Sequence, residues 1–88
     1  MKTIITFKST THALDSEQLL LKAGLSVGLM SRPTELGSDC GFCLTVTKDD
    51  LDKALGLIKA AGLVWQGTYL HRPESKPRWQ KMETCLEP

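Results

Sequence analysis

The sequence predicts an α+β protein, and three observations support that prediction. Short β-branched or aromatic runs and two longer amphipathic segments follow one another in the order strand, helix, strand, strand, helix, strand. Both amphipathic segments end in Ala-Gly-Leu, at 23–25 and 61–63, just before the next strand, which indicates two similar halves. About 70 residues accommodate this order, so we expect the ferredoxin-like βαββαβ two-layer sandwich, a four-stranded antiparallel sheet with two helices on one face.

The first half begins with a strand and a helix. Residues 3–7, Thr-Ile-Ile-Thr-Phe, have the composition of a strand. Ser9, Thr10 and Thr11 are residue types that cap helix amino termini, and the apolar spacing after them predicts a helix over about 10–23. Gly24 should end this helix, because a residue without a Cβ adopts the left-handed conformation at low cost.

The middle of the chain predicts two more strands. Residues 27–30 read as a short second strand that Pro33 closes. Residues 42–46 follow a loop rich in turn formers and alternate in the manner of a half-buried third strand. Right-handed crossovers place the third strand between the first and second, and the first between the third and fourth.

The second helix is expected to start at an acidic run. Thr47 with Asp50 approximates a capping box, and apolar residues then recur at spacings of three and four as far as Gly62. Aspartates in a first turn suit the positive end of the helix dipole, so the run is interpreted as helix initiation and not as a metal site. Residues 64–70 form the expected fourth strand.

The last stretch, 71–88, differs in character from the domain predicted over 1–70. It begins as a polar segment punctuated by prolines. Trp79, Met82 and Leu86 would share one face of a short helix that also carries Cys85. A flexible tail, a short docked helix and a partner-binding segment are the three alternatives.

Composition narrows the classes of function. Eleven basic residues stand against ten acidic ones in 88, which leaves no excess positive charge for phosphates, so nucleic acid is not an expected partner. No apolar run is long enough to cross a membrane, and the start of the chain lacks a signal-peptide pattern, so we expect a cytoplasmic protein. A core this small leaves apolar surface that a homodimer could cover.

The three cysteines indicate thiol chemistry and not a structural framework. An odd number of cysteines without an export signal favours reduced thiols. One C-x-x-C without a second pair does not make a zinc site, so no metal is expected. Paired carboxylates, a phosphate-binding glycine loop and a Ser/His/Asp set are absent at recognisable spacing, and no cofactor is expected.

Cys40 is the candidate reactive residue. It lies in the loop Gly37-Ser38-Asp39-Cys40-Gly41, at the mouth of the third strand. In the predicted topology, Ser9-Thr10-Thr11-His12 at the start of the first helix would face this loop. A helix amino terminus offers unpaired N–H groups and partial positive charge, which can lower the pKa of a thiol. His12 could add a proton relay or a positive charge, whereas Asp39 would oppose the thiolate.

Cys43 has a more ordinary interpretation. It alternates with core positions and is expected to pack as a small apolar residue, toward the other side of the sheet or an interface. The C-G-F-C spacing does not favour a dithiol pair. Three extended steps separate α-carbons by about 10 Å, beyond the limit of about 7 Å for a disulfide unless Gly41 makes a tight turn.

Several stretches together resemble one known family. They are Lys2-Thr3-Ile4-Ile5-Thr6-Phe7 with Ser9-Thr10-Thr11-His12-Ala13, then Ser38-Asp39-Cys40-Gly41, then Ala61-Gly62-Leu63 leading into Trp65-Gln66-Gly67-Thr68-Tyr69. They are similar to the small bacterial domains labelled putative selenium/sulfur carrier-like proteins. The resemblance covers about residues 1–70. It implies that Cys40 is the position that carries sulfur or selenium, as a persulfide or selenopersulfide, between donor and acceptor proteins, in a non-enzymatic or barely enzymatic carrier.

The chain departs from that family pattern in two places. Cys43 stands where a small apolar residue is usual, and the tail adds Cys85. Either could be a resolving thiol, which leaves a thiol oxidoreductase as one alternative. The other is a non-catalytic interaction or oligomerisation module with structural cysteines. A carrier needs Cys40 alone, an oxidoreductase needs two thiols that meet, and a module tolerates the loss of Cys40.

Overall fold

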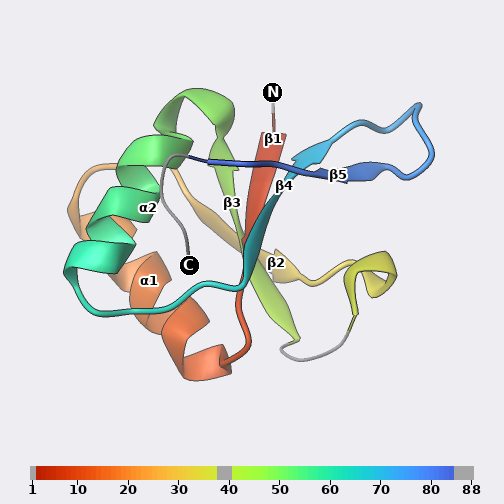
Figure 1. Ribbon diagram of the computed structural model, residues 1–88. Helices are drawn as coiled ribbons and strands as arrows, with labels where there is room; N and C mark the ends of the chain where they lie inside the picture. Colours follow the sequence, from red (N-terminus) through yellow and green to blue (C-terminus); the bar gives the residue numbers. More distant parts are fainter. Residues whose placement is uncertain (1, 38–40, 85–88) are drawn as a thin grey trace.

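The computed structural model describes residues 2–37 and 41–84 (Figure 1). Its elements, in chain order, are β1 (Lys2–Thr6), α1 (Thr10–Lys22), β2 (Gly28–Ser31), the 3₁₀ turn η1 (Thr34–Leu36), β3 (Phe42–Thr47), the 3₁₀ turn η2 (Lys48–Asp50), α2 (Leu51–Ala60), β4 (Gly67–His71) and β5 (Trp79–Lys81). The predicted strands and helices are all present within a few residues of their expected bounds. β5 and the two 3₁₀ turns were not expected.

The sheet is antiparallel throughout, with the strand order β2-β3-β1-β4-β5. An α+β protein with two helices and an antiparallel sheet is therefore confirmed. The predicted positions of the first and third strands are those observed, but the prediction of four strands is wrong. The described part of the chain forms five, because Trp79–Lys81 pairs with β4, with Tyr69 opposite Lys81 and His71 opposite Trp79.

The helix considered for the tail is also wrong for the residues that the structure describes. The spacing of Trp79 and Met82 fits a helix, yet these residues continue the sheet: the Met82 N–H donates to the Thr68 carbonyl at 2.9 Å. Backbone pairing with β4 satisfies the polar groups that a short isolated helix would leave marginal. Cys85 and Leu86 lie outside the described residues.

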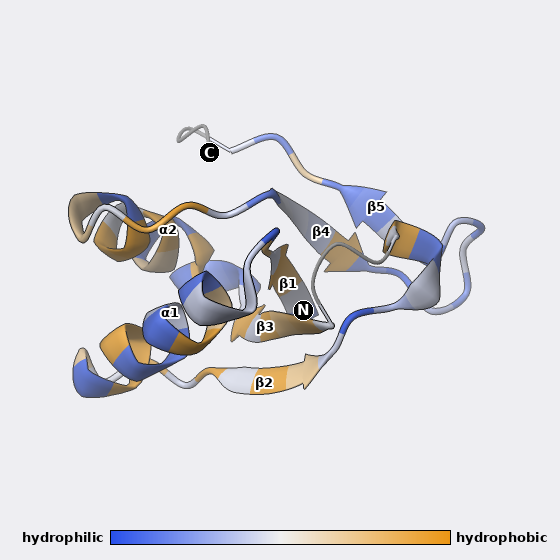
Figure 2. Cartoon of the chain, turned by 90° about the horizontal axis from the view of Figure 1, so that it is seen from below, coloured by the Kyte–Doolittle hydropathy of each residue, from blue (hydrophilic) through white to orange (hydrophobic). Residues whose placement is uncertain are grey.

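Both helices lie on the same side of the sheet (Figures 1 and 2). Alternate strand residues point toward them, and these side chains merge with the apolar faces of α1 and α2 into the main core. Its buried members are Ile5, Phe7, Ala13, Leu20, Leu25, Leu44, Val46, Leu51, Ala54, Leu55, Ile58 and Trp65.

A second, smaller cluster covers the helix-free side of the sheet. Ile4, Cys43 and Trp79 are its buried members, and the partly buried Met30, Leu36 and Tyr69 pack against them. These residues come from all five strands and from η1. β5 and η1 thus supply apolar cover on the side where no helix packs, which explains why Trp79 is buried in a segment of polar composition.

The repeated Ala-Gly-Leu sequence has a structural explanation in the helix ends. After α1, the Gly24 N–H donates to the Leu21 carbonyl and the Leu25 N–H to the Leu20 carbonyl, with Gly24 at φ +84°. α2 ends with the same pair of bonds, and Gly62 has φ +77°. This is the Schellman arrangement, which requires a residue that tolerates the left-handed conformation. Both glycines predicted to end the helices are confirmed.

The start of α2 differs from its prediction. Residues 48–50 form η2, and Thr47 precedes this turn in an extended conformation without a side-chain capping hydrogen bond. The expected capping box of Thr47 with Asp50 is therefore wrong. The 3₁₀ turn tightens the entry into α2, so the threonine does not lie in the position from which its hydroxyl would cap the longer helix.

Candidate functional site

The candidate loop is described at its two stems, Gly37 and Gly41. Cys40, with Ser38 and Asp39, falls outside the described residues, as does the possible resolving thiol Cys85. The geometry of the site is therefore built from the residues that flank the loop.

Strand register brings the stems to the predicted edge of the sheet. Thr6, the last residue of β1, pairs with Cys43 near the start of β3, and Ser31 at the end of β2 pairs with Phe42. The first residues of β3 therefore lie beside the end of β1, from which the chain enters α1 (Figure 1). This confirms that the end of the first strand, the start of the first helix and the entrance to the third strand share one edge.

The start of α1 is capped by Ser9. Its hydroxyl accepts a hydrogen bond from the His12 backbone N–H at 3.4 Å, and Thr10 and Thr11 form the first turn. All of α1 is described, and its first turn contains no acidic side chain. The positive end of the helix dipole at this sheet edge is therefore not offset by a carboxylate within that turn.

His12 holds a structural position. Its Nδ1 accepts a hydrogen bond from the Val64 backbone N–H at 3.2 Å. An imidazole that accepts at Nδ1 is neutral and carries its proton on Nε2. His12 thereby ties the first turn of α1 to the segment between α2 and β4, a role that the sequence did not suggest.

Arg32 is a site residue that sequence reasoning missed. Its side chain donates two hydrogen bonds, from Nη1 to the Phe7 carbonyl at 3.1 Å and from Nη2 to the Leu36 carbonyl at 2.6 Å. Its backbone N–H donates to the Gly41 carbonyl at 3.0 Å. One residue thus contacts the end of β1, the end of η1 and the carboxyl-terminal stem of the loop. No periodicity or motif signals such contacts, because main-chain carbonyls leave no trace in the sequence.

Cys43 is fully buried, at 0% exposure. It is a reduced cysteine on the helix-free side of the sheet, in the small cluster with Ile4 and Trp79. The prediction that it packs as a small apolar residue is confirmed, and of the two positions expected for it, the other side of the sheet or an interface, it takes the first. In this position the thiol is shielded from solvent reagents by the side chains around it.

The hairpin formed by β4 and β5 contacts η1, which directly precedes the first stem of the loop. Arg78 donates from Nε and Nη2 to one oxygen of Glu35, at 3.1 and 2.7 Å. These bonds, with backbone hydrogen bonding near Glu35, hold the pKa of its carboxyl below the ordinary value. Leu36 also packs in the same cluster as Trp79. The residue preceding Gly37 is therefore held from two directions, by Arg32 and by the cluster under the hairpin.

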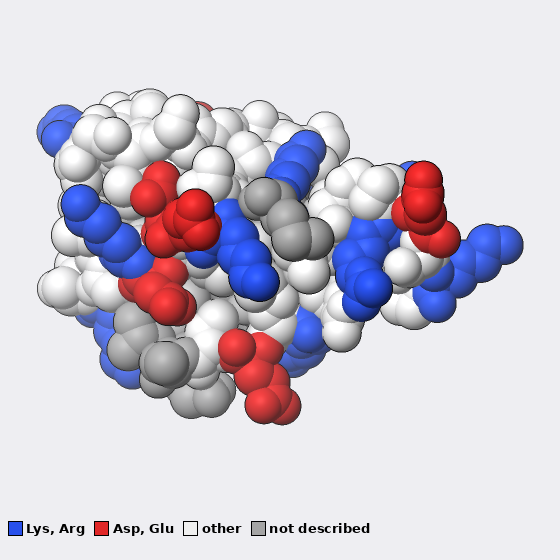
Figure 3. Space-filling view, turned by 90° about the horizontal axis from the view of Figure 1, so that it is seen from above, with Lys and Arg blue, Asp and Glu red and all other residues white. Residues whose placement is uncertain are grey.

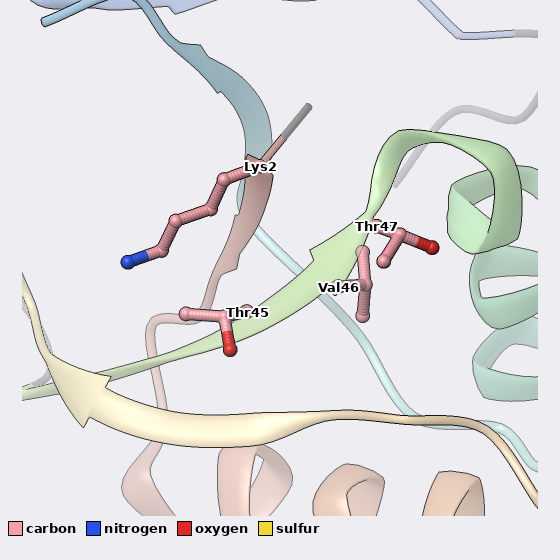
Figure 4. A pocket seen from close by; sticks show the side chains of 4 residues that line it. All are labelled: Lys2, Thr45, Val46 and Thr47. Atoms are coloured by element: carbon pink, nitrogen blue, oxygen red, sulfur yellow. The ribbon is translucent and has the colours of Figure 1, made fainter.

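A shallow hollow of about 350 Å³ lies elsewhere on the sheet, lined by Lys2, Thr45, Val46 and Thr47 (Figure 4). Lys2 and Thr47 pair at the start of β1 and the end of β3, which is the opposite end of these strands from Gly41. The hollow contains no nucleophilic cysteine or histidine among its lining residues. It does not belong to the candidate thiol site.

Charges are mixed on the face that contains the start of β1, at the other end of that strand from the candidate loop. On that face, seen in Figure 3, basic and acidic side chains are interspersed and form no continuous field of one sign. Within residues 2–37 and 41–84, no three His, Cys, Asp or Glu side chains gather as metal ligands would. None of the helices in that part of the chain is long and apolar enough to span a membrane.

Comparison with known proteins identifies a family. A family model described as "Putative Se/S carrier protein-like" matches residues 2–70. No curated protein and no solved structure matches the chain. The matched region contains both helices, the strands β1, β2 and β3, all of β4 except His71, and the Ser38-Asp39-Cys40-Gly41 motif. β5 lies beyond it.

Proposed function

Because the chain belongs to the putative Se/S carrier protein-like family, we propose that it carries sulfur or selenium on Cys40 for delivery to an acceptor protein. The family match over residues 2–70 is the observation that carries this proposal. Cys40 lies inside the matched region, whereas Cys85 lies outside it. The remaining cysteine of the matched region, Cys43, is buried.

The proposed chemistry is transfer of one sulfane atom between thiols. The Cys40 thiolate attacks the terminal sulfur of a donor persulfide, R–S–SH. The new bond joins Cys40 Sγ to that sulfur, the donor S–S bond breaks, and the donor leaves as a thiolate, R–S⁻. An acceptor nucleophile then attacks the same terminal atom, and Cys40 leaves as a thiolate. A donor with a terminal selenium atom reacts in the same way, and neither step needs an external oxidant or a cofactor.

Each flanking residue has a proposed supporting role. Ser9, Thr10 and Thr11 present the backbone N–H groups of the α1 amino terminus, where an anionic sulfur is stabilised. His12 fixes the start of α1 through Val64. Ser38, Asp39 and Gly41 complete the loop around Cys40, and Gly41 also accepts the Arg32 N–H.

The burial of Cys43 favours a carrier over a dithiol oxidoreductase. A resolving thiol must reach the attacked sulfur, and Cys43 is fully buried in the small cluster. Cys85 remains the alternative resolving thiol for this proposal. Partners would be a donor and an acceptor protein in turn, in the cytoplasm, and the chain could act as a homodimer. We also propose a ferredoxin-like classification for the first four strands, which the order β2-β3-β1-β4 supports.

Loading with a small-molecule persulfide tests the proposal. The reduced protein is treated with glutathione persulfide, and intact-protein mass spectrometry measures the gain of one sulfur atom. Peptide mapping then locates it. We expect loading at Cys40, release of the atom to an added thiol, and loss of loading in Cys40→Ser. Cys43→Ala and Cys85→Ser are the matched controls and should load as the wild type does.

The other outcomes separate the alternatives. If Cys40→Ser loads as well as the wild type, the carrier function is wrong and the interaction-module alternative gains support. If Cys85→Ser prevents release but not loading, the chain works as a pair of thiols. Repeating the loading with a selenium donor of the same form determines which of the two elements the thiol accepts faster.

A further inference from the structure

The turn between β4 and β5 projects beyond the rest of the molecule (Figure 1). Four of the eleven basic residues of the chain lie between 71 and 81, against one acidic residue, whereas residues 1–70 contain seven of each sign. This hairpin also lies beyond the region that the family model matches. An excess of positive charge is therefore concentrated on one projection, which we call the basic arm (residues 71–81).

The turn of the basic arm is held in one shape by backbone hydrogen bonds. The Arg72 N–H donates to the Arg78 carbonyl at 2.6 Å, and the Ser75 N–H donates to the Arg72 carbonyl at 2.9 Å. The base of the arm is attached to the body by the buried Trp79 and by the two bonds from Arg78 to Glu35. A ligand of this turn finds it already ordered, so binding costs little conformational entropy.

A hollow of about 350 Å³ opens on this turn, lined by Arg72, Ser75, Lys76, Pro77 and Gln80. Two of these lining residues are cationic and none is anionic. Nη1 of Arg72 donates to Oε1 of Gln80 at 2.7 Å, which orients the guanidinium at the hollow. This bond is to a neutral amide, so it leaves the charge of Arg72 in place. The other N–H groups of a guanidinium form a planar fork that suits a carboxylate.

A neighbouring hollow of about 260 Å³ shares Arg72 and Ser75 with the first but is also lined by Glu74. The carboxylate of Glu74 would repel an anion there. An anionic ligand is therefore directed to the hollow that contains Lys76. Both cationic side chains of that hollow belong to exposed residues, so a partner can reach them from solvent.

We propose that the basic arm is a docking site for an acidic segment of a partner protein, with a carboxylate of that segment bound by Arg72 and Lys76. Charge complementarity identifies this occupant, and Lys81 on β5 extends the positive charge along the arm, so a run of carboxylates gains more than a single one. Nucleic acid suits the arm less well, because its tryptophan, Trp79, is buried and cannot stack on bases. The site goes beyond the proposed function, since it does not involve Cys40.

Binding of a defined acidic peptide tests the proposal. The probe is a rhodamine-labelled peptide of alternating glutamate and glycine, and its binding to the full chain is measured by fluorescence anisotropy at low ionic strength. We expect this peptide to bind, and the same peptide with glutamine in place of glutamate not to bind. Arg72→Gln and Lys76→Gln should each weaken binding about twofold to fivefold, since each removes one surface ion pair.

Two further variants separate a formed site from diffuse attraction. Lys22→Gln is the matched control: it removes an equal charge from an exposed residue at the end of α1 and should leave the affinity unchanged. Gln80→Ala keeps every charge but removes the acceptor that orients Arg72, so it should weaken binding about twofold. Equal weakening by Lys22→Gln and Lys76→Gln, with no effect of Gln80→Ala, would overturn the docking site. Urea unfolding followed by circular dichroism checks that each variant is folded.

Other occupants are outcomes of the same experiment. A labelled DNA oligonucleotide with the same number of charges that binds more tightly than the peptide, and depends equally on Arg72, would overturn the choice of a protein partner. Self-association of the chain, measured by light scattering and abolished by Arg72→Gln with Lys76→Gln, would overturn it in favour of a second copy. No persulfide enters these measurements, so failure of the docking site is distinguishable from failure of the proposed carrier function.

Discussion

Replacing Trp79 with alanine should expose Cys43 while leaving the main core intact. Trp79 is 8% exposed and belongs, with Ile4 and Cys43, to the small cluster on the helix-free side of the sheet, so the loss of its side chain should open that cluster. Its ring also contacts the ring of His71, with centroids 4.4 Å apart. Among the described residues, β5 pairs only with β4, and it is three residues long, so this one side chain supplies most of its apolar attachment.

The size of the effect follows from the buried area. A tryptophan buries about 150–250 Å², and at about 25 cal/mol per Å² this gives about 4–6 kcal/mol. Residual structure in the unfolded chain makes that an upper limit, and core Trp→Ala substitutions cost about 3–5 kcal/mol. Because β5 is an edge strand, the loss should appear first as local detachment of the hairpin. A loss of about 3 kcal/mol raises the detached population about 100-fold.

The assay is time-resolved alkylation with N-ethylmaleimide, read at each cysteine by peptide mass spectrometry. Cys43 in the wild type should react far more slowly than in urea, and Trp79→Ala should accelerate it about 100-fold, as the detached population requires. Trp79→Phe, which retains an aromatic ring, should give an intermediate rate. Equal labelling of Cys43 in the wild type and Trp79→Ala would refute the view that attachment of the hairpin keeps the small cluster closed over the thiol.

Three further predictions concern local contacts. Arg78→Met should raise the pKa of Glu35 toward its ordinary value of about 4.3, because hydrogen bonds from Arg78 hold it lower. The wild-type pair stabilises the fold above about pH 4.3, and this contribution is lost as the pH falls through the lower pKa of Glu35 in the folded protein. An NMR titration in which Arg78→Met leaves the midpoint of Glu35 unchanged would contradict this. Gly62→Ala should lower the free energy of unfolding in urea by about 1 kcal/mol. The cost comes from the left-handed backbone conformation at φ +77°, since the added Cβ would meet no described atom within 4 Å beyond its own neighbouring backbone. His12→Ala should lower the free energy of unfolding by about 0.5–1.5 kcal/mol, because it removes the acceptor for the Val64 N–H; an unchanged free energy of unfolding in urea would contradict this.

Local rules predicted the parts of this fold that depend on neighbouring residues. Gly24 and Gly62 end the helices where expected, because the Schellman bonds join residues at most five apart in the chain. The alternation of Cys43 with its neighbours placed its side chain on the helix-free face, since strand side chains change sides at every residue. Both features could be predicted from a few consecutive residues.

Such local rules could not predict the contacts between residues far apart in the sequence. Trp79 and Met82 have helical spacing, but the partner that makes them a strand is β4, whose register is set by tertiary pairing. Arg32 looks like an ordinary loop cation, and its importance comes from the carbonyls of Phe7 and Leu36, 25 and 4 residues away. At the candidate site, sequence reasoning identified the edge of the sheet and the cap at Ser9, and missed the residue that holds the stems together.

The two clusters give this protein a separate optical reporter for each side of its sheet. Trp65 belongs to the core under the helices, and Trp79 belongs to the cluster beneath the hairpin. Those are the two tryptophans of the chain. A variant with phenylalanine at position 65 would emit only from Trp79 and would follow the small cluster. One with phenylalanine at position 79 would emit only from Trp65 and would follow the main core. Hairpin detachment and global unfolding could then be observed as distinct fluorescence transitions in two unlabelled variants.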